Sequence, residues 1–242
     1  MKTYIFDVDG TLTPSRQPIN SDFAKVFNSW MWTVQEKGDQ VMLVTGSDRP
    51  KTLEQLGEKI VSKVDYACFC MGNQVYHNNQ LIHDYQFQPP AQLLEYLEEC
   101  LKESPYSERY GNHIENRGNM INFSIVGRNA VGEQRTKYYF WDKTIKERET
   151  IASIINRVYG KQGVQASVGG ETGIDISGVG KDKSQCMQYI KGQAFFFGDR
   201  MDKAGNDFPL ANALRSDIKH KHRTFHVSSF YDTENFLKNL PK

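Results

Sequence analysis

The sequence predicts an α/β protein: a Rossmann-like core with a mostly parallel sheet, interrupted by an inserted α+β domain with an antiparallel sheet. Short apolar runs at residues 4–6, 40–44 and 66–71 are separated by stretches long enough for helices. This alternation is typical of a parallel sheet. The pattern returns late in the chain with the apolar run 194–198. Between these two parts, apolar and polar residues alternate as in an antiparallel strand with one polar face.

The totals exclude several classes of protein. The 242 residues carry a formal net charge of +1, so we expect neither nucleic acid nor a membrane as partner. No apolar stretch approaches the length of about 18 residues that a transmembrane helix needs. The chain enters an apolar run at once, so we expect no signal peptide, and its four cysteines lack a metal-binding spacing. We therefore expect a cytoplasmic, reduced protein. The basic run 219–223 is more typical of a solvated loop or sheet edge than of a phosphate-backbone site.

The insertion is expected at residues 84–182, with residues 1–83 and 183–242 forming the core. Its start is marked by a break at Pro89-Pro90, which precedes an amphipathic helix rich in leucine. Further elements expected within it are a helix at 146–159 and strands at 164–168 and 174–176. This mixture predicts an antiparallel sheet with helices on one face.

One strand of the insertion carries candidate binding residues. Its apolar residues alternate with Asn122 and Ser124, so these two should lie on a solvent-exposed face. Arg128 shares their parity and can point from the same face, and Arg135 follows one loop later. The alternative interpretation is that these arginines are ordinary solvated surface residues.

The core should contain an amphipathic helix at 22–37 that ends at Gly38. Trp30 and Trp32 in this helix are expected to pack on the sheet rather than to stack on a ligand. The other elements expected in the core are a helix at 51–63, a strand at 66–71, a small hairpin after the turn 72–74, a helix opened by Asp182-Lys183 and a short helix at 208–214.

Two acids mark a candidate catalytic site. Asp7 and Asp9 directly follow the first apolar run and are two residues apart, so both should face the crevice beyond the strand's carboxyl end. In such a pair one carboxylate can attack and the other can transfer a proton, with a hard cation offsetting their repulsion. The alternative is an acidic turn that closes a strand. Thr45, with Ser47 as a rival, follows the second strand and can donate a hydrogen bond to a phosphate oxygen.

The segment from Phe6 to Thr13 resembles motif I of the haloacid dehalogenase superfamily of phosphotransferases. The resemblance implies that Asp7 becomes an aspartyl-phosphate, that Asp9 is the general acid and base, and that Mg²⁺ is the cofactor. Three further features of this superfamily are present in order. Thr45 or Ser47 matches motif II, Lys183 matches the motif III lysine, and Asp199 and Asp207 match the motif IV acids. The implied metal ligands are Asp7, Asp9 through its carbonyl, Asp199 and Asp207.

Over nearly the whole chain the closest resemblance is to the eukaryotic-type phosphomannomutases, and the insertion is similar to a type IIB cap. The resemblance implies a mutase that interconverts hexose 6-phosphate and 1-phosphate through a hexose 1,6-bisphosphate, which also serves as activator. It implies a small-molecule sugar phosphate as substrate and a homodimer formed through the cap. The implied substrate-binding residues are Arg16, Arg117, Asn122, Arg128, Arg135, Gly173 and Asp175.

Gly173 departs from this family, which usually has a serine two residues before the aspartate that matches Asp175. We expect Gly173 to lie in a loop between two cap strands and the missing hydroxyl to weaken discrimination between mannose and glucose phosphates. Restoring the serine should then lower the Michaelis constant. The alternative function is a Mg²⁺-dependent sugar-phosphate phosphatase of the same superfamily, in which water takes the phosphoryl group. A binding module without activity is the third interpretation.

Overall fold

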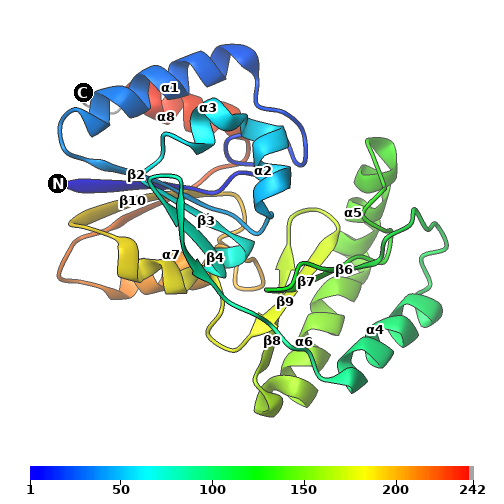
Figure 1. Ribbon diagram of the computed structural model, residues 1–242. Helices are drawn as coiled ribbons and strands as arrows, with labels where there is room; N and C mark the ends of the chain where they lie inside the picture. The colour runs from blue at the N-terminus through cyan, green and yellow to red at the C-terminus, as the bar shows by residue number, and fades with distance from the viewer. Residues whose placement is uncertain (240–242) are drawn as a thin grey trace. The chain divides into compact units, whose positions relative to one another are not determined.

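A computed structural model describes residues 1–239 and divides them into two compact units (Figure 1). The first, called the core here, comprises Met1–Asp84, Asp182–Lys203 and the residues from Asp207 onward. The second, called the cap, comprises Tyr85–Lys181 and Ala204–Asn206. Within residues 1–239 no helix is both long and apolar enough to cross a membrane.

The core is built on one seven-stranded sheet, with the strand order β11-β10-β1-β2-β3-β4-β5. Its parallel strands are β1 (Lys2–Phe6), β2 (Gln40–Val44), β3 (Tyr66–Phe69), β10 (Gln193–Gly198) and β11 (Arg223–His226). The hairpin of β4 (Gln74–His77) and β5 (Gln80–Asp84) adds two antiparallel strands at one edge. The predicted parallel sheet and the small hairpin are thus confirmed.

β3 ends two residues earlier than its sequence predicts. Cys70 and Met71 adopt positive φ angles of 50° and 63° and begin the 3-10 turn η1 (Cys70–Gly72). A left-handed backbone cannot continue an extended strand, so the ladder stops at Phe69.

The helices of the core lie on both faces of its sheet, with α1 and α8 on one face and α7 on the other (Figure 1). They are α1 (Ser21–Gln35), α2 (Arg49–Leu56), α3 (Glu58–Val61), the 3-10 helix η3 (Lys183–Tyr189), α7 (Phe208–Ser216) and α8 (Phe230–Asn239). The single helix expected at 51–63 is wrong: Gly57, with a φ of 77°, separates α2 from α3. The helix at Lys183 is of the 3-10 type. Neither β11 nor α8 was predicted.

Aromatic packing fixes β1, an interior strand of the sheet, between these layers. Tyr4 and Phe6 point to the same face and meet Trp30 of α1 edge-on, at ring-centroid distances of 4.9 and 5.5 Å. On the other face, Ile5 packs in an apolar cluster with Leu210 of α7. Each fully buried side chain of this size contributes about 1.5–3 kcal/mol. Trp32 is 65% exposed, so the expectation that it packs on the sheet is wrong.

The cap contains a four-stranded antiparallel sheet with the order β6-β7-β9-β8 and three α-helices. The strands are β6 (Ile114–Asn116), β7 (Ile121–Phe123), β8 (Val164–Gly169) and β9 (Gly173–Gly178). The helices are α4 (Ala91–Glu103), α5 (Glu133–Ile145) and α6 (Glu147–Tyr159), followed by the 3-10 turn η2 (Gly160–Gln162). The antiparallel sheet of the insertion is confirmed.

The two faces of the cap sheet differ in chemistry. Ile121, Phe123 and Ile176 contribute to an apolar cluster with residues of α4, α5 and α6. Asn122 and Asp175, which are partners in the β7–β9 register, point to the other face. Both are only 4% exposed, so this face is polar but not open to solvent, contrary to the expectation.

Candidate active site

Four charged side chains meet at the carboxyl ends of β1 and β10. Asp7 follows β1, and its backbone N–H donates to the carbonyl of Phe197 at 3.0 Å, which continues the parallel ladder. The ammonium of Lys183 lies 2.7 Å from Asp7 Oδ1 and 2.7 Å from Asp207 Oδ1. Carboxylate oxygens of Asp7, Asp199 and Asp207 lie within 4.8 Å of one another. The structure thus brings together four of the residues predicted from widely separated motifs.

Two glycines make this crowding of carboxylates possible. A Cβ at Gly10 would lie 2.5 Å from Asp199 Oδ2, and the φ of Gly10 is +75°, which side chains resist. A Cβ at Gly198 would lie 2.5 Å from Asp207 Oδ2. Both positions therefore require glycine for the acids to stand where they do.

The electrostatics of this group call for additional positive charge. Three carboxylates share one ammonium, which leaves an excess of two negative charges when all are ionised. Burial raises the pKa of Asp7 to about 7, although Lys183 opposes the shift. Burial, followed by repulsion from Asp7 and Asp207, also raises the pKa of Asp199 well above its usual range. Burial alone would lower the pKa of Lys183, but Asp207 and Asp7 raise it.

This donor set fits a divalent hard cation. Carboxylate oxygens are the preferred ligands of Mg²⁺, and a charge of +2 would offset the excess of the site. The side chain of Asp9 does not belong to this group of oxygens.

Asp9 is held by a separate set of donors. Its Oδ1 accepts from the backbone N–H of Arg16 at 2.5 Å and from Gln55 Nε2 at 3.0 Å, and its Oδ2 accepts from the hydroxyl of Ser47 at 3.0 Å. Gln55 was not predicted to act here. It lies on the buried side of α2 with Thr52, and a glutamine facing the core is the signal that could have identified it.

The structure separates the two rival hydroxyl residues. The Ser47 hydroxyl donates to Asp9, whereas Thr45 Oγ1 accepts from the backbone N–H of Ser47 at 3.0 Å. Thr45 is buried directly after β2, the neighbour of β1. Because this contact uses Thr45 as an acceptor, its O–H hydrogen can donate to another oxygen.

The predicted arginines of the cap pair with acids that the sequence did not point to. Arg117 Nε donates to Glu115 Oε2 at 2.9 Å, and Arg128 Nε lies 3.2 Å from the same oxygen. Arg135 Nε donates to Glu171 Oε2 at 3.1 Å. Arg128 lies beyond the end of β7, so the alternation of side chains along a strand does not determine where it points. Arg135 follows the loop after Arg128, as expected, and lies in the first turn of helix α5.

Asp175 is bound through both of its oxygens. Asn122 Nδ2 donates to Oδ1 at 2.7 Å, and Asn206 Nδ2 donates to Oδ2 at 3.2 Å. Gly173 is the first residue of β9, so its expected position in a loop is wrong. Its φ lies outside the positive range that disfavours side chains.

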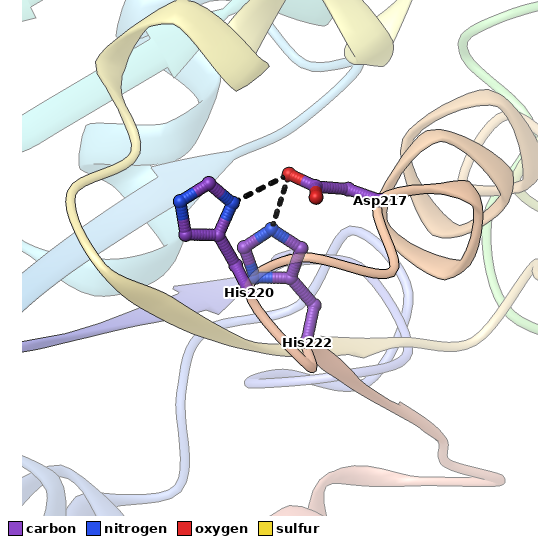
Figure 2. A group of neighbouring side chains, drawn as sticks. All are labelled: Asp217, His220 and His222. Atoms are coloured by element: carbon purple, nitrogen blue, oxygen red, sulfur yellow. Dashed lines mark hydrogen bonds and ion pairs between the residues drawn. The ribbon is translucent and has the colours of Figure 1, made fainter.

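A second group of possible metal ligands lies between α7 and β11 (Figure 2). His220 Nδ1 and His222 Nε2 approach the same oxygen of Asp217 at 2.8 and 3.2 Å. However, Nδ1 of His222 accepts from the backbone N–H of Ala194 at 2.8 Å. A metal-bound histidine normally donates a hydrogen through its other nitrogen, so His222 does not suit a metal. It instead ties the start of β11 to β10.

Comparisons with known proteins agree with this geometry. The sequence profile of the family described as eukaryotic phosphomannomutase matches residues 28–240. The chain is 31% identical over 219 residues to the phosphomannomutase of Schizosaccharomyces pombe, covering 85% of this chain and 83% of the relative. It is 30% identical over 246 residues to phosphomannomutase 1 of Dictyostelium discoideum, covering 98% and 95%.

Among solved structures, a haloacid dehalogenase-like hydrolase from Bacteroides thetaiotaomicron has the same fold, with a TM-score of 0.57 at 16% identity over 99% of both chains. The resemblance inferred from the sequence is therefore confirmed, and the chain belongs to the eukaryotic phosphomannomutase family.

Proposed function

We propose that this protein is a phosphomannomutase that moves a phosphoryl group between the 6- and 1-positions of a hexose through a phosphorylated Asp7. One observation carries the proposal: the buried Asp7, at the end of β1, shares Lys183 with the buried Asp207, and Asp199 completes a group of three carboxylates. Family membership supports the mutase assignment, because the relatives named phosphomannomutase cover most of this chain.

The core residues have separate chemical roles in this proposal. The Asp7 carboxylate attacks the phosphorus of a hexose bisphosphate, and the bond from phosphorus to the sugar oxygen breaks. Asp9 gives its proton to that oxygen and later takes one from the hydroxyl that attacks the phospho-aspartate. Lys183 offsets the charge of the transition state, and Thr45 donates to a phosphate oxygen. A bound Mg²⁺, held by Asp7, Asp199, Asp207 and the Asp9 carbonyl, would supply further charge neutralisation.

The cap is proposed to bind the sugar phosphate. Arg117, Arg128 and Arg135 have buried guanidinium groups and can hold a phosphate dianion through paired hydrogen bonds. Asp175 is proposed to accept from sugar hydroxyls. Arg16, which was also predicted to bind the substrate, lies in the core and donates its backbone N–H to Asp9.

We also propose a homodimer formed through the cap. Helix α5 and the turn before it expose Val131, Phe140 and Ile145, which are 52–68% accessible. Light scattering of the wild type and of Phe140→Glu would test this, since a charge at the interface should yield monomers.

A phosphorus NMR time course with mannose 1-phosphate, with and without trace glucose 1,6-bisphosphate, tests the function. We expect mannose 6-phosphate to form, faster with the bisphosphate, and Asp7→Asn to form none. Release of inorganic phosphate as the sole product would instead indicate the phosphatase. Absence of any Mg²⁺-dependent phosphorylation of Asp7 would favour a binding module.

A further inference from the structure

Gly173 and Asn122 compete for one space in the cap. A Cβ placed on Gly173 would lie 2.7 Å from Asn122 Nδ2 and 3.1 Å from Asn122 Oδ1. The shorter distance is below any that real Cβ atoms tolerate. Because the backbone of Gly173 has no positive φ, its conformation does not require glycine. The neighbouring carboxamide does.

Asn122 cannot easily move out of this space. It is 4% exposed, it is paired with Asp175 in the β7–β9 register, and its Nδ2 donates to Asp175 Oδ1 at 2.7 Å. Rotating the carboxamide by half a turn would bring its oxygen against the carboxylate, which is repulsive. The hydrogen bond with Asp175 therefore fixes which end of the carboxamide is the oxygen.

The side-chain oxygen of Asn122, Oδ1, can still accept a hydrogen bond. Oδ1 is buried and accepts no hydrogen bond from the described part of the chain, residues 1–239. A buried carbonyl without a donor costs about 1–3 kcal/mol, so such a group in a native site requires an explanation.

We propose that Asn122 determines sugar specificity in place of a side chain at position 173. Its carboxamide fills the space above Gly173, and its Oδ1 accepts a hydrogen bond from a substrate hydroxyl. A carbonyl oxygen can only accept, whereas a serine hydroxyl can also donate. The site therefore demands a hydroxyl that donates. This inference rests on the proposed function, since it takes the substrate to be a hexose phosphate.

The first test measures the competition for space and needs no substrate. Gly173→Ser should lower the melting temperature of the wild type, and the same change should lower it much less in an Asn122→Ala background, where the carboxamide is absent. In a double-mutant cycle, the coupling between positions 173 and 122 should correspond to a change of about tenfold in the unfolding equilibrium constant, as expected for residues in contact. Gly160→Ser is the matched control, because a Cβ there meets nothing within 4 Å. If Gly173→Ser is as stable as the Gly160→Ser control, the proposal is wrong.

The second test measures the hydrogen bond with mannose 1-phosphate and its monodeoxy and deoxyfluoro analogues. Fluorine keeps the size of a hydroxyl but cannot donate. We expect one position at which both analogues raise the Michaelis constant of the wild type about tenfold, with little change in kcat. Asn122→Ala should remove this difference while raising the Michaelis constant of the parent sugar.

Three outcomes separate the two hypotheses. Unchanged discrimination in Asn122→Ala overturns the specificity role although the mutase activity stands. A lower Michaelis constant in Gly173→Ser, as expected from the sequence alone, also overturns it. A wild type inactive on every hexose phosphate refutes the proposed function and the hydroxyl contact together, while the melting experiment still decides the competition for space.

Discussion

Replacing Lys183 by methionine is the most severe single test of the core site. Methionine approximates the length of lysine but carries no charge. Lys183 is fully buried and bridges Asp7 and Asp207 at 2.7 Å each, so its loss leaves buried carboxylates without compensation. Removing one partner of a buried pair costs about 3–5 kcal/mol. For a domain of this size, about 2–4 °C of melting temperature corresponds to each kcal/mol, so we expect a decrease of about 6–20 °C.

Circular dichroism melts in EDTA would measure this decrease. Lys191→Met is the matched control, because it removes the same charge from an exposed lysine of the core and should leave the melting temperature nearly unchanged. Excess Mg²⁺ should restore part of the stability of Lys183→Met, since a divalent cation supplies the missing charge. A melting temperature equal to that of the control in EDTA would refute the electrostatic account of this site.

The same account fixes the sign of the pH dependence. Without a divalent cation, burial raises the pKa of Asp7 to about 7, against about 3.9 in an unfolded chain. Between these values the folded state holds a proton that the unfolded state has released, so stability falls as the pH rises from about 4 to about 7. Lys183→Met removes a group that lowers this pKa. The difference in melting temperature between the wild type and Lys183→Met should therefore be larger at about pH 8 than at about pH 5.

Three further variants test other contacts. Asp199→Asn should raise the melting temperature in EDTA by removing one uncompensated charge, and should abolish a Mg²⁺-induced shift of about 5–10 °C, measured by calorimetry. Gln55→Leu removes a donor to Asp9 and should lower kcat about tenfold with little change in the Michaelis constant; unchanged kinetics would exclude a positioning role. Arg148→Met breaks a buried pair in the cap and frees the carbonyls of the β8–β9 turn, so the melting temperature should fall and the Michaelis constant rise. Exposed Arg157→Met is its control.

The parts of the site that could be predicted lie where local pattern and chemistry coincide. Asp7 and Asp199 each end an apolar run, and such runs become the central strands β1 and β10. The partners of Asp9 and of the cap arginines could not be derived in the same way. Gln55 and Asp9, which form a hydrogen bond, are 46 residues apart in the sequence. Glu115 pairs with both Arg117 and Arg128 only because the chain after β7 turns back toward β6.

Helix α5 was missed for a different physical reason. It buries Arg135, Tyr138 and Asp142 and exposes Phe140 and Ile145, so its hydrophobic pattern is nearly the reverse of an ordinary surface helix. Periodicity of apolar residues is the main signal for a helix, and here the buried side is partly charged. Asp142 is paired there with Arg148 at 2.7 Å, a contact made only in the folded cap.

Charge is distributed differently in the two units, and this difference constrains how each can bind a phosphate. At the site in the core, the carboxylates of Asp7, Asp199 and Asp207 outnumber the single ammonium of Lys183 by two. A phosphate can therefore approach Asp7 only when additional positive charge is present. In the cap, Arg117 and Arg128 both approach the carboxylate of Glu115, and Arg135 pairs with Glu171. A phosphate dianion bound there has to compete with these two glutamates for the same guanidinium hydrogens. Under the proposed function, Glu115 and Glu171 would hold the arginines in place without substrate and would lower the affinity for free phosphate, which would favour ligands that add sugar contacts.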